Sequence, residues 1–338
     1  MKKKIFIWCS SISEESGEGR LARLFLKKLK SFTVARYKFV FLNKKKENHG
    51  IYHKYLQPFL GVVLLWKYYI LGKRICYINY LPLWNFFLFL FLPPSTILGP
   101  ITGSFASKKI NTSFARKILM PIFFQVSYNI IKIRFNLLLQ ALDNFKRIDK
   151  KKIFISNFQL LYLYRKISNI VKIKDIDLII YLRTHKNKNY TFQKKILLYL
   201  LEDLKNLKIL VFGSVFRVVN NKNFKNYKKM PLKKIFKYIR RSKFSLIGED
   251  NIYSFFSLDS ILSGNYIFYS NKLKEDKKLL NKSPFIKLSF NYAKKVSNEI
   301  KFIIKKYVKI KDNETIINYN YLKKINSSSN LYFSRLKL

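Results

Sequence analysis

Acidic side chains are scarce in this chain. Only 18 Asp and Glu stand against 67 Lys and Arg in 338 residues, so the formal net charge is +49 at pH 7. A protein of this charge is attracted to phosphorylated small molecules, to the anionic face of a membrane and to nucleic acid. The lysines are dispersed along the whole chain and no nucleic-acid-binding module is recognisable, which favours the first two partners over the third.

Cysteine and histidine are scarce as well. Cys9 and Cys76, the only cysteines, lie in apolar segments, which argues against a disulfide framework or a cysteine metal site and favours a reducing compartment. His49 and His53 are expected on a polar surface loop, and the histidines do not have the spacing of metal ligands. His185 lies in a basic loop, either as a helper in anion binding or as an ordinary surface residue.

Long apolar runs are also missing. The basic start MKKKIFIWCSS has only a few apolar residues before its serines, so it predicts a first strand and not a secretory signal. The segment 77–98 contains three prolines, and its longest uninterrupted apolar part, 86–92, is far below the roughly 20 residues of a membrane span. We expect a short buried or surface-dipping helix there, between strands at 75–80 and 96–98.

What the chain does have is apolar material for buried cores. Hydrophobic residues make up 49% of it, with 31 Phe and 23 Tyr, and its length favours two domains. Strand-like apolar runs alternate with helix-period segments, a pattern typical of parallel sheets covered on both faces. The alternation loosens between 143 and 175. The sequence therefore predicts an α/β protein with two Rossmann-like domains, 1–150 and 151–310, facing a ligand-binding cleft, and a C-terminal tail or strap, 311–338.

The individual elements follow from the same alternation. In the first half, strands are expected at 4–8, 38–42, 74–80, 96–98 and 137–142, and helices near 21–29, 56–70, 86–92 and 114–135. In the second half, strands are expected at 177–183, 208–214, 244–248 and 266–270, and helices at 192–204, 232–241 and 287–308.

A glycine-containing segment follows the first predicted strand. In SEESGEGRLARLFLKKL, Gly17, Gly19 and Arg20 stand just before a helix, whose exposed N–H groups attract phosphate. The third glycine of the dinucleotide fingerprint is absent, so an ordinary strand-to-helix turn is the alternative to a ligand loop.

A second such segment, GPITG, follows the strand at 96–98. It contains Gly99, Thr102 and Gly103. The carboxyl ends of parallel strands face the cleft, so this loop is well placed to contact a substrate. A plain structural turn is the alternative.

The second half carries a basic pair in DLIIYLRTHKNKN. Arg183 and Lys188 lie five residues apart at the mouth of a predicted strand. A bidentate guanidinium together with a point-charge ammonium suits a diphosphate that gains negative charge as it leaves.

The segment GEDNIYSFFSLDSILSGNYIFY, residues 248–269, gathers acids in a chain that has few. Glu249, Asp250 and Asp259 lie within eleven residues. One interpretation is that Asp250 or Asn251 caps a helix and that Asp259 lies on its polar face. That interpretation does not account for the basic pair in the same half.

These segments, in this order, resemble a glycosyltransferase of GT-B architecture, of the family 4 type found in bacterial surface polysaccharide synthesis. That group typically carries an E-x7-E element, a small residue, an apolar pair, a glycine and a strand. Asn251 and Asp259 stand at the two ends of that spacing, and LDSILSGNYIFYS matches its second half. The spacing from Arg183 to Lys188 matches the family's arginine and lysine pair, and NYLPLWNFFLFLFLPPSTILGPITG is similar to a segment of such bacterial enzymes.

The resemblance implies roles for these residues. Asp259 binds the donor ribose, Arg183 and Lys188 hold the donor diphosphate, and Glu249 and Asn251 lie near the transferred sugar. Further donor contacts fall on Gly213, Asp250, Ile252, Tyr253 and Ser254, while Gly17, Gly19 and Arg20 stand where the family has its glycine-rich first loop.

The sequence also departs from the family pattern. Asn251 replaces the first motif glutamate, Asp259 is one methylene shorter than the second, and the first half lacks the histidine of many relatives, with Asn79 the nearest candidate.

The implied function is transfer of a sugar, with retention, from a nucleotide diphosphate sugar to a glycan or lipid-linked acceptor in cell-surface polysaccharide or lipopolysaccharide synthesis. We expect a cytoplasmic enzyme, peripheral at the inner face of the membrane, with no cofactor, no metal and no nucleic acid. The alternatives are a basic nucleic-acid-binding protein and a GT-B scaffold without catalysis.

Overall fold

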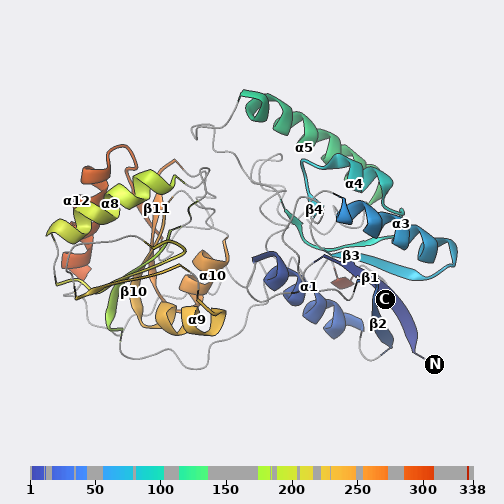
Figure 1. Ribbon diagram of the computed structural model, residues 1–338, viewed down its shortest axis with the longest axis horizontal. Coiled ribbons are helices and arrows are strands. Elements are labelled where there is room, and N and C mark those ends of the chain that lie inside the picture. The colour runs from blue at the N-terminus through green and yellow to red at the C-terminus, as the bar shows by residue number, and fades with distance from the viewer. Residues whose placement is uncertain are drawn as a thin grey trace. The chain divides into compact units, whose positions relative to one another are not determined.

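The computed structural model describes residues 2–10, 12, 17–33, 36–43, 56–78, 81–102, 114–135, 174–182, 184, 189–203, 206–215, 222–228, 230–248, 254–272, 285–307 and 333–334. They form two compact units (Figure 1). The first runs from β1 (Lys3–Cys9) to α5 (Phe114–Arg134) and includes Phe333, and the second runs from β7 (Ile176–Tyr181) to α12 (Ala293–Tyr307).

The first unit is built on a four-stranded parallel sheet in the order β2-β1-β3-β5. The outer strands are β2 (Tyr37–Phe41) and β5 (Ile97–Leu98), and β3 (Arg74–Ile78) lies between β1 and β5. A second ladder pairs β4 (Leu81–Pro82) with β6 (Ile101–Thr102) in parallel. The central strands are apolar because both faces of a parallel sheet are covered, and Ile5 and Ile7 are fully buried.

In the described part of this unit the helices are α1 (Gly17–Thr33), α3 (Gln57–Ile70), α4 (Phe86–Phe91) and α5. Pro58 lies in the first turn of α3, where its missing N–H costs nothing. A Cβ at Gly61 of the same helix would come within 2.4 Å of the Trp8 ring, so this residue has to be glycine for α3 to pack on β1. None of the helices in the described part of the chain is long and apolar enough to span a membrane.

The core of the first unit takes in a residue from the end of the chain. Phe333 is 2% exposed, and its ring lies 5.2 Å from that of Phe25 and 5.6 Å from that of Phe32, both on α1. The predicted tail or strap therefore contributes at this point to the hydrophobic core of the first unit.

The second unit has a six-stranded parallel sheet in the order β12-β11-β10-β7-β8-β9. The added strands are β8 (Ile209–Phe212), β9 (Phe224–Tyr227), β10 (Ser242–Gly248), β11 (Tyr266–Ser270) and β12 (Phe285–Leu288). In chain order from one edge this is 3-2-1-4-5-6, the doubly wound order that places a ligand crevice where the order reverses. Here the reversal falls between β7 and β10.

Helices cover both faces of this sheet (Figure 1). α8 (Tyr190–Asp203) and α12 pack together against buried side chains of one face, such as Leu178, Leu246 and Phe268. α9 (Leu232–Arg240) and α10 (Phe255–Leu262) contact each other on the other face.

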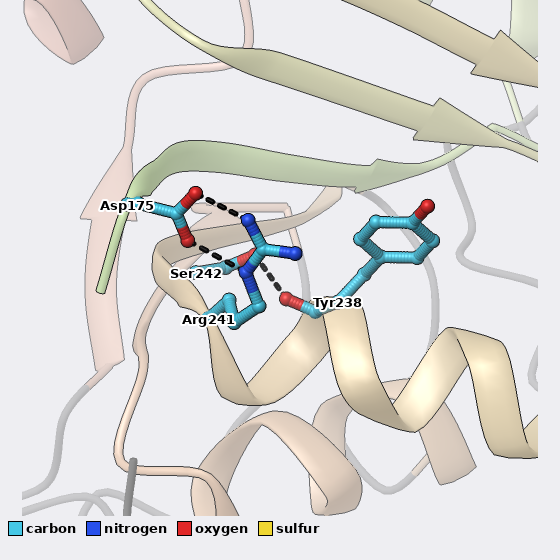
Figure 2. Close-up of polar contacts among 4 residues, drawn as sticks. All are labelled: Asp175, Tyr238, Arg241 and Ser242. Atoms are coloured by element: carbon cyan, nitrogen blue, oxygen red, sulfur yellow. Dashed lines mark hydrogen bonds and ion pairs between the residues drawn. The ribbon is translucent and has the colours of Figure 1, made fainter. Parts of the chain in front are cut away.

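An ion pair joins two segments at the amino-terminal edge of this sheet (Figure 2). Arg241, just after α9, donates from Nε to Oδ1 of Asp175 at 2.7 Å and from Nη2 to Oδ2. These hydrogen bonds lower the pKa of Asp175 and raise that of Arg241. Beside the pair, the Ser242 hydroxyl donates to the Tyr238 carbonyl at 2.8 Å. The pair has a structural role, because Asp175 lies before the first residue of β7 and not at the carboxyl end of that strand, where a ligand would bind.

The structure confirms the predicted fold class of two parallel-sheet α/β units. It corrects the helix predicted over 287–308: β12 occupies 285–288, and the helix begins at Ala293. The strands β4, β6 and β9 were not predicted, and β4 and β6 have two residues each. The predicted strand at 137–142 and the boundaries at 150 and 310 lie outside the described residues, so they stay predictions.

Candidate functional site

The candidate site lies at the carboxyl edge of the second sheet, where the strand order reverses. β7 and β10 are parallel neighbours, with Leu178 opposite Phe244 and Ile180 opposite Leu246, so both strands end at the same edge. The segment with the basic pair follows β7, and the acidic segment 249–253 follows β10. Two motifs that are 60 to 70 residues apart in the sequence thus leave the sheet side by side at its switch point.

Gly248 ends β10 in a conformation that favours glycine. Its φ is +59°, and a Cβ there would come within 2.6 Å of the side-chain amide of Gln193 in the first turn of α8. Glu249, the first residue of the acidic segment, follows Gly248 directly in the sequence. Close packing of β10 on α8 therefore fixes where that segment begins.

Gly213 plays a similar part at the end of β8. Its φ is +97°, and a Cβ would lie 2.7 Å from the carbonyl oxygen of Leu182, the residue before Arg183. The Tyr190 hydroxyl, at the start of α8, lies 3.1 Å from the Ser214 hydroxyl. Close approach to β7 explains this glycine, and its predicted role in donor binding stays a prediction.

An aromatic cluster at this edge was not found by sequence reasoning. Tyr181 and Phe212, the last residues of β7 and β8, stack with ring centroids 5.0 Å apart, and Phe256 of α10 lies 5.9 Å and 5.3 Å from them. The first turn of α10 therefore packs on the ends of both strands. The available signal was an aromatic residue at the last position of each strand.

The helix start in the acidic segment differs from one prediction. Ser254 is the N-cap of α10, and its side chain accepts a hydrogen bond from the Ser257 N–H at 3.2 Å. The alternative with Asp250 or Asn251 as the cap is therefore wrong. The predicted donor contact of Ser254 is a separate matter and stays a prediction.

Asp259 lies in the middle of α10 and is only 2% exposed. The interpretation that it lies on a polar helix face is wrong, because every residue from Phe256 to Leu262 is buried. It is the one acidic side chain in the described ranges that is buried to this degree. Burying a carboxylate is costly, so such a residue is retained for a specific contact.

Three buried hydroxyls belong to the same helix and its C-cap, those of Ser257, Ser260 and Ser263, and none of them has a hydrogen-bond partner among the described residues. Ser257 lies in the first turn, where its N–H donates to the Ser254 side chain and the positive end of the helix dipole favours an anion. This polar side of α10 was not predicted from the sequence.

In the first unit, the predicted glycine-rich loop is part of a helix. Gly17, Gly19 and Arg20 form the first turn of α1, which begins four residues before the predicted start at 21. Nothing lies within 4 Å of a Cβ built on Gly17, so packing does not require glycine at that position. The roles of these residues in a ligand site stay predictions.

Gly99 has a structural explanation. Its N–H donates to the Tyr77 carbonyl at 2.8 Å, and a Cβ there would lie 2.9 Å from that oxygen and from the Ile78 Cα. The plain structural turn accounts for this residue. Thr102 belongs to β6, opposite Pro82.

The remaining candidates lie outside the described residues, and their predicted roles stand as predictions. They are Arg183, Lys188, His185, Glu249, Asp250, Asn251, Ile252, Tyr253, Gly103, His49, His53 and Asn79. Within the part of the chain that the structure describes, no three His, Cys, Asp or Glu side chains are grouped as metal ligands.

No family model matches the sequence, and neither does any curated protein. Solved structures do match along nearly their whole length. One is OtsA in its apo form, with a TM-score of 0.53, 10% identity, and coverage of 100% of this chain and 99% of that one. The chain has the GT-B fold. The sucrose-phosphate synthase of Thermosynechococcus elongatus matches with a TM-score of 0.51, 9% identity and coverage of 99% and 94%.

The GT-B likeness extends to a protein of another reaction class. A putative UDP-N-acetylglucosamine 2-epimerase from Listeria monocytogenes matches with a TM-score of 0.50, 9% identity and coverage of 98% and 94%. At such identities the likeness shows the fold alone. Function therefore has to be argued from the residues at the switch point.

Proposed function

We propose that this protein is a glycosyltransferase that moves a sugar from a nucleotide diphosphate sugar to a glycan or lipid-linked acceptor. The observation that supports the proposal is that β7 and β10, the strands that precede the two motifs in the sequence, end at the same sheet edge. The segment of Arg183 and Lys188 leaves β7, and the segment of Glu249 to Asp259 leaves its neighbour β10. A ligand crevice is expected at that edge of a doubly wound sheet.

The chemistry of these residues suits a nucleotide diphosphate sugar. The guanidinium of Arg183 and the ammonium of Lys188 would hold the diphosphate and stabilise the charge that develops as it leaves. The positive end of the α10 dipole would attract the same anion, and the Ser257 hydroxyl in the first turn would add a donor. Asp259, on the same helix, would accept hydrogen bonds from the ribose hydroxyls.

In the proposed reaction, the bond between the anomeric carbon and the diphosphate oxygen breaks, and a bond forms from that carbon to an acceptor hydroxyl oxygen. The products are the glycosylated acceptor, the nucleoside diphosphate and the released hydroxyl proton. Glu249 and Asn251 are proposed to lie beside the transferred sugar, and retention follows from the family resemblance. The first unit is proposed to hold the acceptor, as a peripheral enzyme of surface polysaccharide synthesis.

Two other readings of the GT-B fold make different predictions. An epimerase would convert a nucleotide sugar without any acceptor, as the name of one structural neighbour describes for that protein. A scaffold, which Asn251 in place of the motif glutamate would explain, would bind a donor and never turn it over. A basic nucleic-acid-binding protein would need neither Arg183 nor Asp259.

The first test is a thermal-shift screen against nucleotide diphosphates and their sugars, because a ligand that binds only the folded state raises Tm. Wild type is compared with Arg183→Ala and Asp259→Asn. The matched controls are Arg36→Ala, an exposed arginine of the first unit, and Asp203→Asn, a carboxylate of α8 that is 53% exposed. We expect one nucleotide sugar to raise Tm in wild type and both controls, and to lose that effect in both site variants.

The stabilising donor is then incubated with and without lipid-linked glycan extracts, and the sugar products are separated. Release of nucleoside diphosphate that requires acceptor supports transfer. Conversion of the donor sugar without acceptor would assign the site to an epimerase, and binding without turnover would assign it to a scaffold. An equal response of all variants, or a Tm shift with nucleic acid alone, would refute the proposed donor site.

A further inference from the structure

Exposed apolar side chains gather on three helices of the first unit. Of the 16 large apolar side chains exposed in the described residues, 13 lie between Leu56 and Ile133. Five are on or beside α3, three on α4 and five on α5. Scattered exposed apolar residues are ordinary, whereas a gathering of this kind marks an interaction surface.

The three helices form one continuous surface. α4 contacts both α3 and α5, and Figure 1 shows the three helices as neighbours. The Phe86 ring of α4 lies 5.5 Å from the Phe123 ring of α5, and the Ser127 hydroxyl of α5 donates to the Leu83 carbonyl just before α4 at 2.6 Å. The exposed residues therefore belong to one face, which we call the α3–α5 face.

The C-terminal end of α4 is unusual in how its backbone is satisfied. Its last four carbonyl groups have no partner within the helix, and all four accept hydrogen bonds from side chains of the flanking helices. These carbonyls are those of Phe89, Leu90, Phe91 and Leu92. Arg134 of α5 donates to the first, second and fourth, with distances of 2.9 Å to the first and 2.8 Å to the fourth, and Trp66 of α3 donates to the third at 2.6 Å.

At an ordinary surface, water would meet these carbonyls. A backbone that enters an apolar medium must instead satisfy its polar groups within the protein. The carboxyl end of α4 meets that condition while Phe87 and Phe91 remain 47% and 49% exposed. Its six residues span about 9 Å at 1.5 Å per residue, which is too short to cross a bilayer and comparable with the depth of the interface.

The sequence that carries this face has charged residues of one sign only. Residues 48–142 contain ten Lys and Arg and no Asp or Glu, although an even spread would place about five of the 18 acids there. Lys67, Lys73 and Arg74 are exposed at the end of α3 and just after it. Two copies of this face would bring like charges together, whereas an anionic lipid surface complements them.

We propose that the α3–α5 face docks on an anionic bilayer, with Phe87, Leu90 and Phe91 inserted at the boundary between headgroups and acyl chains. The basic residues at the rim attract the lipid, and the apolar residues of α4 hold the protein at the interface. Docking would bring the enzyme to a lipid-linked acceptor, and this purpose is the one part of the proposal that rests on the proposed function. Binding itself requires neither donor nor acceptor.

The test is cosedimentation of the full chain with vesicles of phosphatidylcholine alone or mixed with phosphatidylglycerol. Wild type is compared with the double variant Phe87→Ser and Phe91→Ser, and with Phe302→Ser, a still more exposed aromatic on α12 of the second unit. We expect wild type and Phe302→Ser to bind the anionic vesicles alike, and the double variant to bind at least tenfold more weakly. The lipid concentration for half-maximal binding measures the change.

Three results would overturn the proposal. The first is binding of the double variant as tight as that of wild type, and the second is no binding of wild type to anionic vesicles. The third is a wild-type dimer in sedimentation velocity that the double variant lacks, because the face would then belong to a second copy. A donor-induced Tm shift that persists in the double variant shows that the donor site is intact, so failure of docking and failure of the proposed function remain distinguishable.

Discussion

Lys28 offers a quantitative test of how the first unit is packed. It lies on the buried face of α1 and is 2% exposed, one turn from Phe25 and Phe32, whose rings contact Phe333. Burial lowers the pKa of Lys28 from its ordinary value of 10.5 to about 8. At neutral pH the folded protein therefore holds a charged ammonium in a place that disfavours the charge.

The size of the effect follows from the shift. A lowering by about 2.5 units corresponds to about 3 kcal/mol at 1.36 kcal/mol per unit. Between pH 8 and 10.5 the unfolded chain binds more protons at this site than the folded one, so the site's contribution to stability rises with pH there. Below pH 8 both states are protonated, and the full cost is present. Lys28→Met keeps the unbranched stem and removes the charge, so we expect it to raise the free energy of unfolding at pH 7 by up to that amount.

The assay is urea unfolding followed by tryptophan fluorescence. Trp8, Trp66 and Trp84 are the three tryptophans and all lie in the first unit, so the signal reports that unit even if the two units unfold separately. Wild type, Lys28→Met and the exposed control Lys27→Met are compared at pH 7 and pH 10. The advantage of Lys28→Met should shrink at the higher pH. A variant no more stable than wild type at pH 7, or an advantage independent of pH, would refute the reasoning.

Three further perturbations test other parts of the structure. Gly248→Ala should lower the Tm measured by circular dichroism more than Gly72→Ala does. Both glycines have positive φ, but only at Gly248 would the new Cβ come within 2.6 Å of a side chain, that of Gln193. Equal losses of Tm would exclude that contact. Wild type should lose stability, by under about 1 kcal/mol for so exposed a pair, as pH falls from 5 through the lowered pKa of Asp175. Asp175→Asn should not show this loss. If the free energy of unfolding of both proteins depends on pH in the same way, the ion pair with Arg241 does not stabilise the fold. Phe333→Ala should cost the first unit about 3 to 5 kcal/mol in urea unfolding, and a negligible change would place the chain end outside its core.

Much of the fold could be predicted because buried parallel strands are apolar runs. KIFIW, DLIIY and ILVF became central strands for that reason. The failures are elements that lack this signal. β9 is an edge strand of half-buried and exposed residues, and β4 and β6 have two residues each. The burial of Phe333 depends on a contact with α1, some 300 residues away, which no local pattern encodes.

The sheet edge that holds the candidate site could be inferred from the sequence for a related reason, while the placement of its residues stays a prediction. Arg183 and Glu249 each follow an apolar strand, and the parallel order then sets both strand ends at one edge. The details were not predictable. Asp250, Asn251 and Ser254 are all good N-cap residues, and only the helix start decides among them. The burial of Asp259 was missed because a short helix with serines on several sides has no clear polar face.

The distribution of acids connects the two proposals. A net charge of +49 attracts donor, membrane and nucleic acid alike, so charge alone gives no specificity. The chain has no acid over residues 48–142, which carry the α3–α5 face, and three acids within 249–259, the segment that follows β10. On a bilayer an acid would oppose docking, whereas beside a sugar and a ribose a carboxylate accepts hydroxyl hydrogen bonds that lysine cannot accept. Three of the scarce acids therefore lie in the segment that is proposed to recognise the donor, and none lies in the stretch that carries the face proposed to bind the bilayer.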